Sequence, residues 1–242
     1  MELKGVIILI DGNAVEIKNL VKKYPGVEAL QGVDINFPAG RITGLIGPNG
    51  SGKSTILKSI VGLVKPSRGE LLVFGQKLDR RLKEKVAFLP EINHLYKNMK
   101  IVQIIDFFQS QFSTFERKRA LEILDFMNLK PEMRIKSLSK GMAGRVKLVL
   151  TMARNVPLIV MDEPLAGIDP QSRARILEGL INEYDAEKQT IILSTHEVLE
   201  AERFFDYVVF LEYGTVKLQG NADDLRSEHG MSIQDLVKEV FI

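Results

Sequence analysis

One short loop near the start of the chain gathers glycine, lysine and hydroxyl side chains. It consists of Gly47, Pro48, Asn49, Gly50, Ser51, Gly52, Lys53, Ser54 and Thr55. An apolar run at 42–46 precedes it and an amphipathic run at 56–63 follows, which predicts a strand, a turn and a helix. The glycines let consecutive backbone N–H groups point at one anion, and the positive end of the helix adds to the attraction. The pattern therefore predicts a phosphate-binding loop.

Two side chains of this loop suit a nucleoside triphosphate and its metal ion. Lys53 would reach the β- and γ-phosphates, and the Ser54 hydroxyl would hold Mg²⁺. The alternative is a glycine turn that only caps a helix. The strand expected before the loop and the helix expected after it favour phosphate binding.

A second reactive pair follows another apolar run. Residues 158–161 predict a buried strand, and Asp162 and Glu163 come directly after it. In a parallel sheet that end of the strand faces the same crevice as the phosphate-binding loop. We expect Asp162 to hold Mg²⁺ and Glu163 to polarise a water for attack on the γ-phosphate. Without the loop upstream, an acidic helix cap would explain the pair equally well.

Hydrophobic periodicity indicates the strands that must position these residues. They are expected at 15–20, 29–37, 42–46, 70–74, 85–89, 158–161, 190–194, 207–211 and 215–219. Turns are expected at 22–26, 38–40 and 66–69, with a hairpin turn at 212–214. Strands that alternate with helices predict an α/β fold with a mostly parallel sheet and an antiparallel portion at its start.

The middle of the chain changes to a helical period. Apolar residues within 101–108 share one helical face, and Ser113-x-x-Glu116 fits a capping box that would open a second helix. We therefore expect a helical lobe at 93–155, set into a core made of residues 1–92 and 156–242. Further helices are expected at 56–62, 171–184, 222–227 and 233–240.

These motifs resemble, in order and spacing, those of the nucleotide-binding subunits of ATP-binding cassette (ABC) transporters. The resemblance extends from Val15 to Gly220. It implies a RecA-like phosphate-loop NTPase core with an inserted helical lobe. It also implies ATP and Mg²⁺ as cofactors, and ATP hydrolysis that powers transport.

The resemblance assigns further residues around the nucleotide. Tyr24 matches the aromatic side chain that stacks on adenine, and it also fits ordinary packing in a turn. Glu91 occupies the position where most members carry glutamine, which reaches the metal and the attacking water. Its carboxylate can ligate Mg²⁺ but adds a negative charge beside the phosphates. His196, at the end of a strand, matches the histidine near the γ-phosphate, which makes it a catalytic residue with Lys53 and Glu163.

Residues 138–142 resemble the family signature Leu-Ser-Gly-Gly-Gln, with lysine and methionine at its third and fifth positions. The resemblance implies that Ser139 and Gly141 contact the γ-phosphate bound by a second subunit. Asp169 matches a loop that lines the seam between the subunits, and it also fits a helix cap. We therefore expect a homodimer or a pair with a related ATP-binding subunit.

The resemblance also implies membrane-spanning partner subunits and a place on the inner, cytoplasmic face of the cell membrane. Leu95, Tyr96 and Met99 could line the groove in which a helix of such a partner docks, or could pack within the lobe. Glu91, the altered signature and the short C-terminal tail look similar to exporter-type bacterial cassettes, which favours export. The alternatives are a soluble ABC ATPase, in translation or DNA repair, and a regulatory module that transports nothing.

Composition excludes several other classes of protein. The 242 residues are 45% hydrophobic, which is ample for a core, and the net charge of +2 gives no strong attraction to nucleic acid. The absence of cysteine excludes disulfides and thiol catalysis. The apolar run at 6–10 is too short to span a bilayer. Residues 1–13 are expected to be either an extra edge strand or a leftover of cloning.

Overall fold

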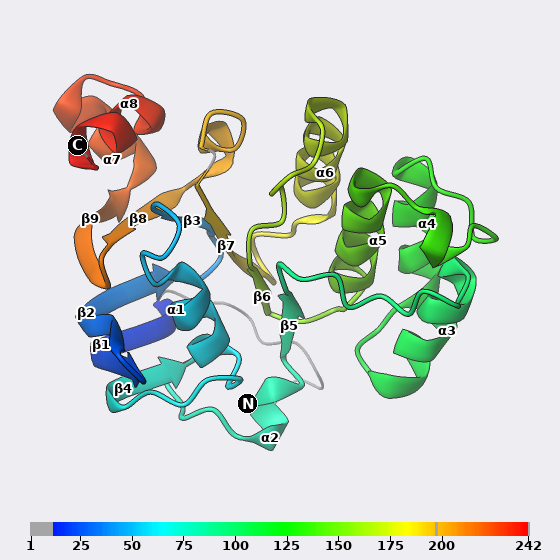
Figure 1. Ribbon diagram of the computed structural model, residues 1–242, viewed down its shortest axis with the longest axis horizontal. Coiled ribbons are helices and arrows are strands. Elements are labelled where there is room, and N and C mark those ends of the chain that lie inside the picture. The colour runs from blue at the N-terminus through cyan, green and yellow to red at the C-terminus, as the bar shows by residue number, and fades with distance from the viewer. Residues whose placement is uncertain (1–11, 197, 242) are drawn as a thin grey trace.

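The computed structural model describes residues 12–196 and 198–241 and contains a mixed six-stranded sheet (Figure 1). The strand order is β5-β6-β7-β3-β8-β9, and all pairs are parallel except β8 with β9. The strands are β3 (Ile42–Ile46), β5 (Val86–Leu89), β6 (Leu158–Met161), β7 (Thr190–Thr195), β8 (Tyr207–Glu212) and β9 (Thr215–Asn221). The expected mostly parallel sheet is confirmed.

A second, antiparallel sheet forms the start of the described chain. It contains β1 (Asn13–Tyr24), β2 (Val27–Pro38) and β4 (Arg68–Val73), in the order β2-β1-β4. The expected antiparallel N-terminal portion is therefore confirmed. Residues 1–13 were expected to be an edge strand or a leftover of cloning, and most of them lie outside the described residues.

Helices gather on two sides of the larger sheet (Figure 1). α3, α4 and α5 lie beyond β5, whereas α7 and α8 lie at the end near β9. The helices are α1 (Lys53–Ile60), α2 (Arg80–Lys83), α3 (Ile101–Gln111), α4 (Arg117–Phe126), α5 (Lys140–Met152), α6 (Pro170–Glu183), α7 (Ala222–His229) and α8 (Ile233–Val240).

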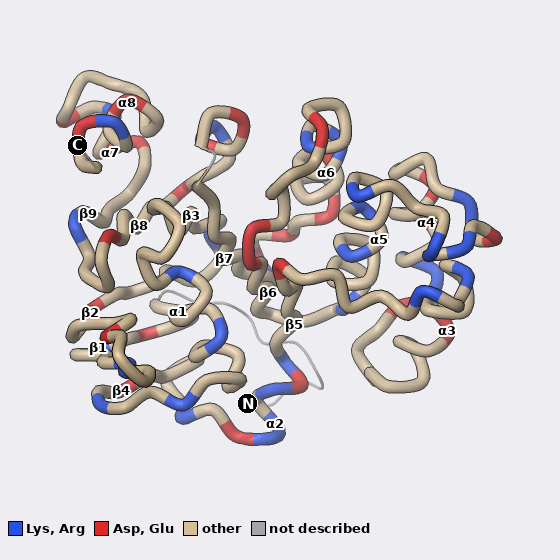
Figure 2. Tube along the Cα trace, in the orientation of Figure 1, with Lys and Arg blue, Asp and Glu red and all other residues tan. Residues whose placement is uncertain are grey.

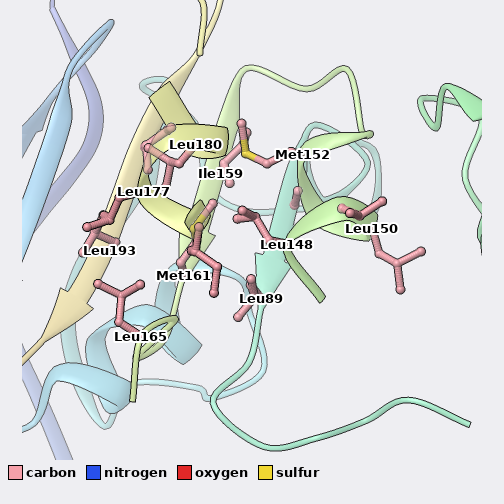
Figure 3. Close-up of a cluster of buried hydrophobic side chains, with 14 of the residues drawn as sticks. Leu89, Leu148, Leu150, Met152, Ile159, Met161, Leu165, Leu177, Leu180 and Leu193 are labelled. Atoms are coloured by element: carbon pink, nitrogen blue, oxygen red, sulfur yellow. The ribbon is translucent and has the colours of Figure 1, made fainter. Parts of the chain in front are cut away.

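The larger sheet is buried on both faces, which explains the continuous apolar runs of its strands. In β6, Leu158 and Val160 join a cluster with α1 and the smaller sheet. Ile159 and Met161 join the other cluster, with α5 and α6 (Figure 3). The helix that follows the glycine-rich loop is thus held between the two sheets, so the loop has a fixed position above the strand ends.

Several local predictions were wrong. The expected capping box at Ser113 and Glu116 does not open α4, which begins at Arg117 with no side-chain cap. The reason is tertiary: Phe115 forms a β-bridge with Arg154, and the Glu116 N–H donates to the Ala153 carbonyl at 2.8 Å, so this segment stays extended. The turns expected at 22–26 and 66–69 are shorter, because β1 continues to Tyr24 and β4 begins at Arg68. The short helix α2 was not predicted.

Charged side chains of both signs are interspersed along the chain (Figure 2). This agrees with the small net charge of +2. Among the described residues, no helix combines the length and the apolar character needed to cross a membrane.

Candidate functional site

The glycine-rich loop joins β3 to α1 and wraps around the side chain of Lys53. This residue is buried, and its ammonium donates to the carbonyls of Gly47 at 2.6 Å and Pro48 at 3.1 Å. A Cβ at Gly47 would collide with the Leu211 carbonyl of β8. Gly52, just before α1, has φ +110°, a conformation that side chains strongly disfavour. Glycine is therefore required at both ends of the turn.

Asp162 lies at the end of β6 and is fully buried. Its Oδ1 atom accepts hydrogen bonds from the hydroxyls of Ser54 and Ser194, both at 2.9 Å. Its Oδ2 atom is also buried but has no hydrogen-bond partner among the described residues. An unpaired buried carboxylate oxygen is costly, so this site suits a cation.

Glu163 is the next residue, and its backbone has an unusual φ of +46°. The Glu163 N–H donates to the Ser194 hydroxyl at 2.9 Å, which helps to hold that conformation. The carboxylate lies between two other predicted residues: Oε1 is 3.3 Å from the Lys53 ammonium, and Oε2 is 2.9 Å from Nδ1 of His196. Oε1 accepts no hydrogen bond from a described residue, so the lysine charge is what balances it there.

Lys53, Glu163 and His196 line one cavity of 370 Å³ at the carboxyl ends of the parallel strands. Its lining includes Ala29 in addition to the residues expected from the sequence. The structure therefore brings together most of the predicted loop with the second acid and the histidine. The lining residues expected from the sequence are Asn49, Gly50, Ser51, Gly52, Lys53, Ser54, Thr55, Glu91, Glu163 and His196.

Seven predicted site residues do not line this cavity. Gly47, Pro48 and Asp162 are bonded to Lys53 or Ser54, which do line it. The other four are Tyr24, Ser139, Gly141 and Asp169. Tyr24 is 41% exposed, and the Lys22 ammonium lies 4.9 Å from the centre of its ring. Ser139 is exposed at the start of α5, where its hydroxyl accepts a hydrogen bond from the Met142 N–H at 3.2 Å. It is thus a helix cap whose outer side faces solvent.

The starts of α5 and α6 touch each other. Asp169 caps α6 by accepting the Ser172 N–H at 2.9 Å, which confirms the predicted helix cap. The Ser172 N–H and hydroxyl hold the pKa of Asp169 below its usual value. A Cβ at Gly141 would lie only 2.8 Å from the Asp169 carboxylate and from the Ser172 hydroxyl. Glycine is needed there because the two helix starts approach so closely.

Comparison with known proteins decides the family. The model of the family described as ABC transporter matches residues 30–166, more than half of the chain. The chain belongs to the ABC transporter family. An uncharacterized ABC transporter ATP-binding protein of Nostoc sp. (strain PCC 7120) is 33% identical over 82% of this chain, which spans 62% of that relative's length. The Nod factor export ATP-binding protein I of Cupriavidus pinatubonensis is 30% identical over 87% of this chain and 67% of its own.

Solved ABC proteins share the fold. One structure of an ATP-binding subunit of an ABC transporter has a TM-score of 0.83 and 30% identity, covering 95% of this chain and all of the other. A dimeric ATP-binding cassette in a post-hydrolysis state, bound to ADP and Pi, has a TM-score of 0.75 and 27% identity, with coverage of 86% and 98%. The predicted fold class and the ATPase class are confirmed, and the chain is an ATP-binding subunit of this family.

Two residues of the ABC site were missed by the sequence analysis. Ser194 ties the two acids together, since it bonds both the Asp162 carboxylate and the Glu163 N–H. Its position two residues before His196, at the end of a buried strand, was a usable signal. Lys147 holds the backbone of the Glu91 loop from α5, and no sequence pattern pointed to it.

The residues of this cassette fit a magnesium ion. Asp162 Oδ2 lacks a partner among the described residues, and the Ser54 hydroxyl lies on the other oxygen of the same carboxylate. Both are oxygen ligands, which Mg²⁺ prefers. Among the described residues no group of three or more His, Cys, Asp or Glu side chains could hold a metal alone.

Proposed function

We propose that this cassette hydrolyses ATP to drive transport through separate membrane-spanning subunits, from the cytoplasmic face of the membrane. One observation carries the proposal: the carboxylate of Glu163 lies between Lys53 and His196 in the cavity of the phosphate-binding loop. That arrangement joins a phosphate-binding cation to a carboxylate able to orient water.

Each residue has a distinct role in the proposed reaction. Lys53 leaves its two carbonyl partners for the stronger charge of the β- and γ-phosphates. Asp162, Ser54 and Glu91 hold Mg²⁺, which neutralises the phosphate charge when it is bound. Glu163 accepts a proton from the water that it orients, and His196 fixes the Glu163 carboxylate and contacts the γ-phosphate. Catalysis is then mostly positioning and charge stabilisation.

The exposed start of α5 supports a two-subunit site. Ser139 and the first N–H groups of α5 can receive an anion, because nothing in the cavity of the same chain uses them. We propose that two copies, or this chain and a related one, face each other head to tail, so that Ser139 of each completes the other's site. Asp169, beside Gly141, then lies at the seam. The solved post-hydrolysis relative is dimeric, which supports the proposal.

We propose a docking surface for a membrane subunit other than the one expected from the sequence. Leu95 is only 7% exposed and packs in the core, although Tyr96 is 53% exposed. A separate cavity of 210 Å³ lies between the end of α1, β5, α3 and α5. We propose that residues 93–155 form the lobe and residues 1–92 and 156–242 the core. We further propose that this lobe-to-core cavity binds the partner helix. The apolar walls of the cavity include Val61, Leu63, Phe88, Phe108 and Phe112.

Export is the direction we propose. The relative from C. pinatubonensis is described as a Nod factor export protein, and Glu91 and the altered signature were the sequence features that favoured export. The transported compound is set by the membrane subunits.

The test separates hydrolysis from membrane coupling. The variant Leu63→Asp places a charge on a 67% exposed leucine that lines the lobe-to-core cavity and does not line the nucleotide cavity. We expect wild-type ATPase activity in solution, and loss of sedimentation with membranes of the source organism. Lys118→Asp, on the outer surface of α4, is the matched control and should still sediment. Sedimentation of the Leu63→Asp variant would contradict the docking surface, and absence of Mg²⁺-dependent ATPase activity in the wild type would contradict the function.

A further inference from the structure

Lys147 is a buried lysine that the proposed reaction does not use. It lies in α5 and is 8% exposed. Its ammonium donates to the carbonyls of Pro90 at 2.7 Å and Glu91 at 2.9 Å. Both acceptors belong to the loop that follows β5 and carries Glu91 into the nucleotide cavity. One side chain thus fastens this loop to α5.

The contact between Lys147 and the Glu91 loop joins the nucleotide cavity to α5. Glu91 lines the nucleotide cavity of its own chain. Lys147 lies about two turns after the start of α5, and that start carries the exposed Ser139. α5 is one helix of 13 residues and is mostly buried, so Lys147 and the Ser139 cap belong to a single stiff element.

A second, smaller cavity lies on the lobe side of the catalytic acids. It measures 120 Å³, and both Glu91 and Glu163 line it as well as the nucleotide cavity. Its remaining charged walls are the side chains of Lys140 and Lys147. The two glutamates therefore separate the nucleotide from the lysines of α5, and Lys147 is the one that holds backbone atoms of the Glu91 loop.

The charges around Lys147 support a link to the acids. Burial lowers the pKa of Lys147, and the neighbouring carboxylates of Glu91 and Asp162 act in the opposite direction, while Lys140 adds to the lowering. The cation of Lys147 thus faces the proposed metal-binding acids from the lobe side. It offers positive charge on the lobe side of the Glu91 carboxylate.

We propose that Lys147 is a positioning residue that couples the nucleotide pocket of its own chain to the α5 surface offered to the second subunit. The coupling acts through the Glu91 loop, which Lys147 binds by two backbone carbonyls. Nucleotide bound at the phosphate loop shifts Glu91, and α5 follows. This inference rests on the proposed function, since it needs Ser139 to act on the nucleotide of a second subunit.

The variant Lys147→Met tests the connection, because methionine keeps an unbranched apolar stem but lacks the N–H donors. We expect kcat for ATP hydrolysis to fall about tenfold, while the Kd for ATP in EDTA changes less than about twofold. Lys147→Arg, which restores charge and donors, should recover most of kcat. Lys118→Met is the matched control, because this lysine is on α4 with a 92% exposed side chain, and it should equal the wild type.

Hydrogen exchange of the monomer gives a readout that does not depend on turnover. At protein concentrations at which gel filtration shows monomers, ATP and Mg²⁺ should slow amide exchange at 47–55 and at 138–143 in the wild type. In Lys147→Met only the phosphate loop, 47–55, should be slowed. If Lys147→Met does not fold, Lys147→Leu, which also lacks N–H donors, should show the same loss at 138–143.

Two results would overturn the inference. One is a wild-type kcat in Lys147→Met, and the other is ATP-dependent slowing at 138–143 that survives loss of the lysine. Either would leave the proposed function intact if the wild type hydrolyses ATP. A wild type that neither binds nor hydrolyses ATP would instead refute the proposed function itself.

Discussion

The cavity at the phosphate loop and the start of α5 are both rich in site residues, but they are built in opposite ways. In and directly beside the cavity, Lys53, Asp162 and Glu163 are buried and bonded to one another or to Ser54, Ser194 and His196. At the start of α5, Ser139 is exposed and only caps its own helix. The first region is complete within one chain, whereas the second offers hydrogen-bond donors that its own cavity does not use.

The contrast bears on how turnover can be controlled. Groups that are held by buried hydrogen bonds cost little to organise when the nucleotide arrives. Under the proposed function, a serine supplied by a second subunit makes hydrolysis depend on assembly, because the γ-phosphate is then fully surrounded only in the dimer. One chain is then sufficient to bind ATP, whereas hydrolysis of ATP requires two chains. The following variants test that division.

Removing Lys53 should have the largest effect. Lys53→Ala is expected to raise the Kd for ATP at least about 100-fold, or about 2.7 kcal/mol, because a charge-assisted contact to the phosphates is lost. Isothermal titration with ATP measures this. Lys58→Ala, later in the same helix, is the matched control. Unchanged ATP affinity in Lys53→Ala would contradict the assignment of this cavity as the nucleotide-binding site.

Glu163→Gln should separate binding from hydrolysis. The amide keeps the shape of the side chain but cannot take a proton from water, so kcat should fall about 100-fold or more while ATP still binds. The trapped ATP should hold two chains together, and gel filtration with ATP should show a dimer. Glu178→Gln, on the exposed side of α6, serves as control. A Glu163→Gln protein that remains monomeric with ATP at high protein concentration counts against the mechanism.

Ser139→Ala should affect hydrolysis but not binding by the single chain. The lost cap costs about 1 kcal/mol of stability, and ATPase activity should fall about tenfold. Mixing Ser139→Ala with Lys53→Ala is decisive for a homodimer, since one of the two sites then has both intact residues. Activity should reappear on mixing. If ATPase activity does not recover on mixing, Ser139 acts in the site of its own chain. Ser137→Ala is the matched control.

Tyr24 should have the smallest effect. Tyr24→Ala is expected to weaken ATP binding about fivefold to tenfold, or about 1 kcal/mol, because a stacking surface for adenine is lost. Tyr24→Phe keeps the ring and should bind like the wild type. Equal affinity of the alanine and phenylalanine variants would show that this exposed ring only packs beside Lys22.

Some features were readable from the sequence because they depend on neighbours along the chain. The loop at 47–55, the two acids after 158–161 and the Asp169 cap were found from local spacing and apolar runs. The capping box predicted at Ser113 was wrong because it considered only neighbours along the chain. Phe115 pairs instead with Arg154, which is distant in the sequence. Local patterns hold only where no distant partner competes for the same backbone groups.

Residue types and their spacing predicted which side chains could bind phosphate, bind a metal ion or accept a proton, and that buried strands would carry them. The packing of the sheet and the lobe brings Lys53, Glu163 and His196 together in one cavity and leaves Ser139 exposed. The same packing lets Lys147 fasten the Glu91 loop to α5. The physical reason is that these contacts join residues from separate strands and helices. Their distances follow from how the sheet and lobe pack, which no local spacing records.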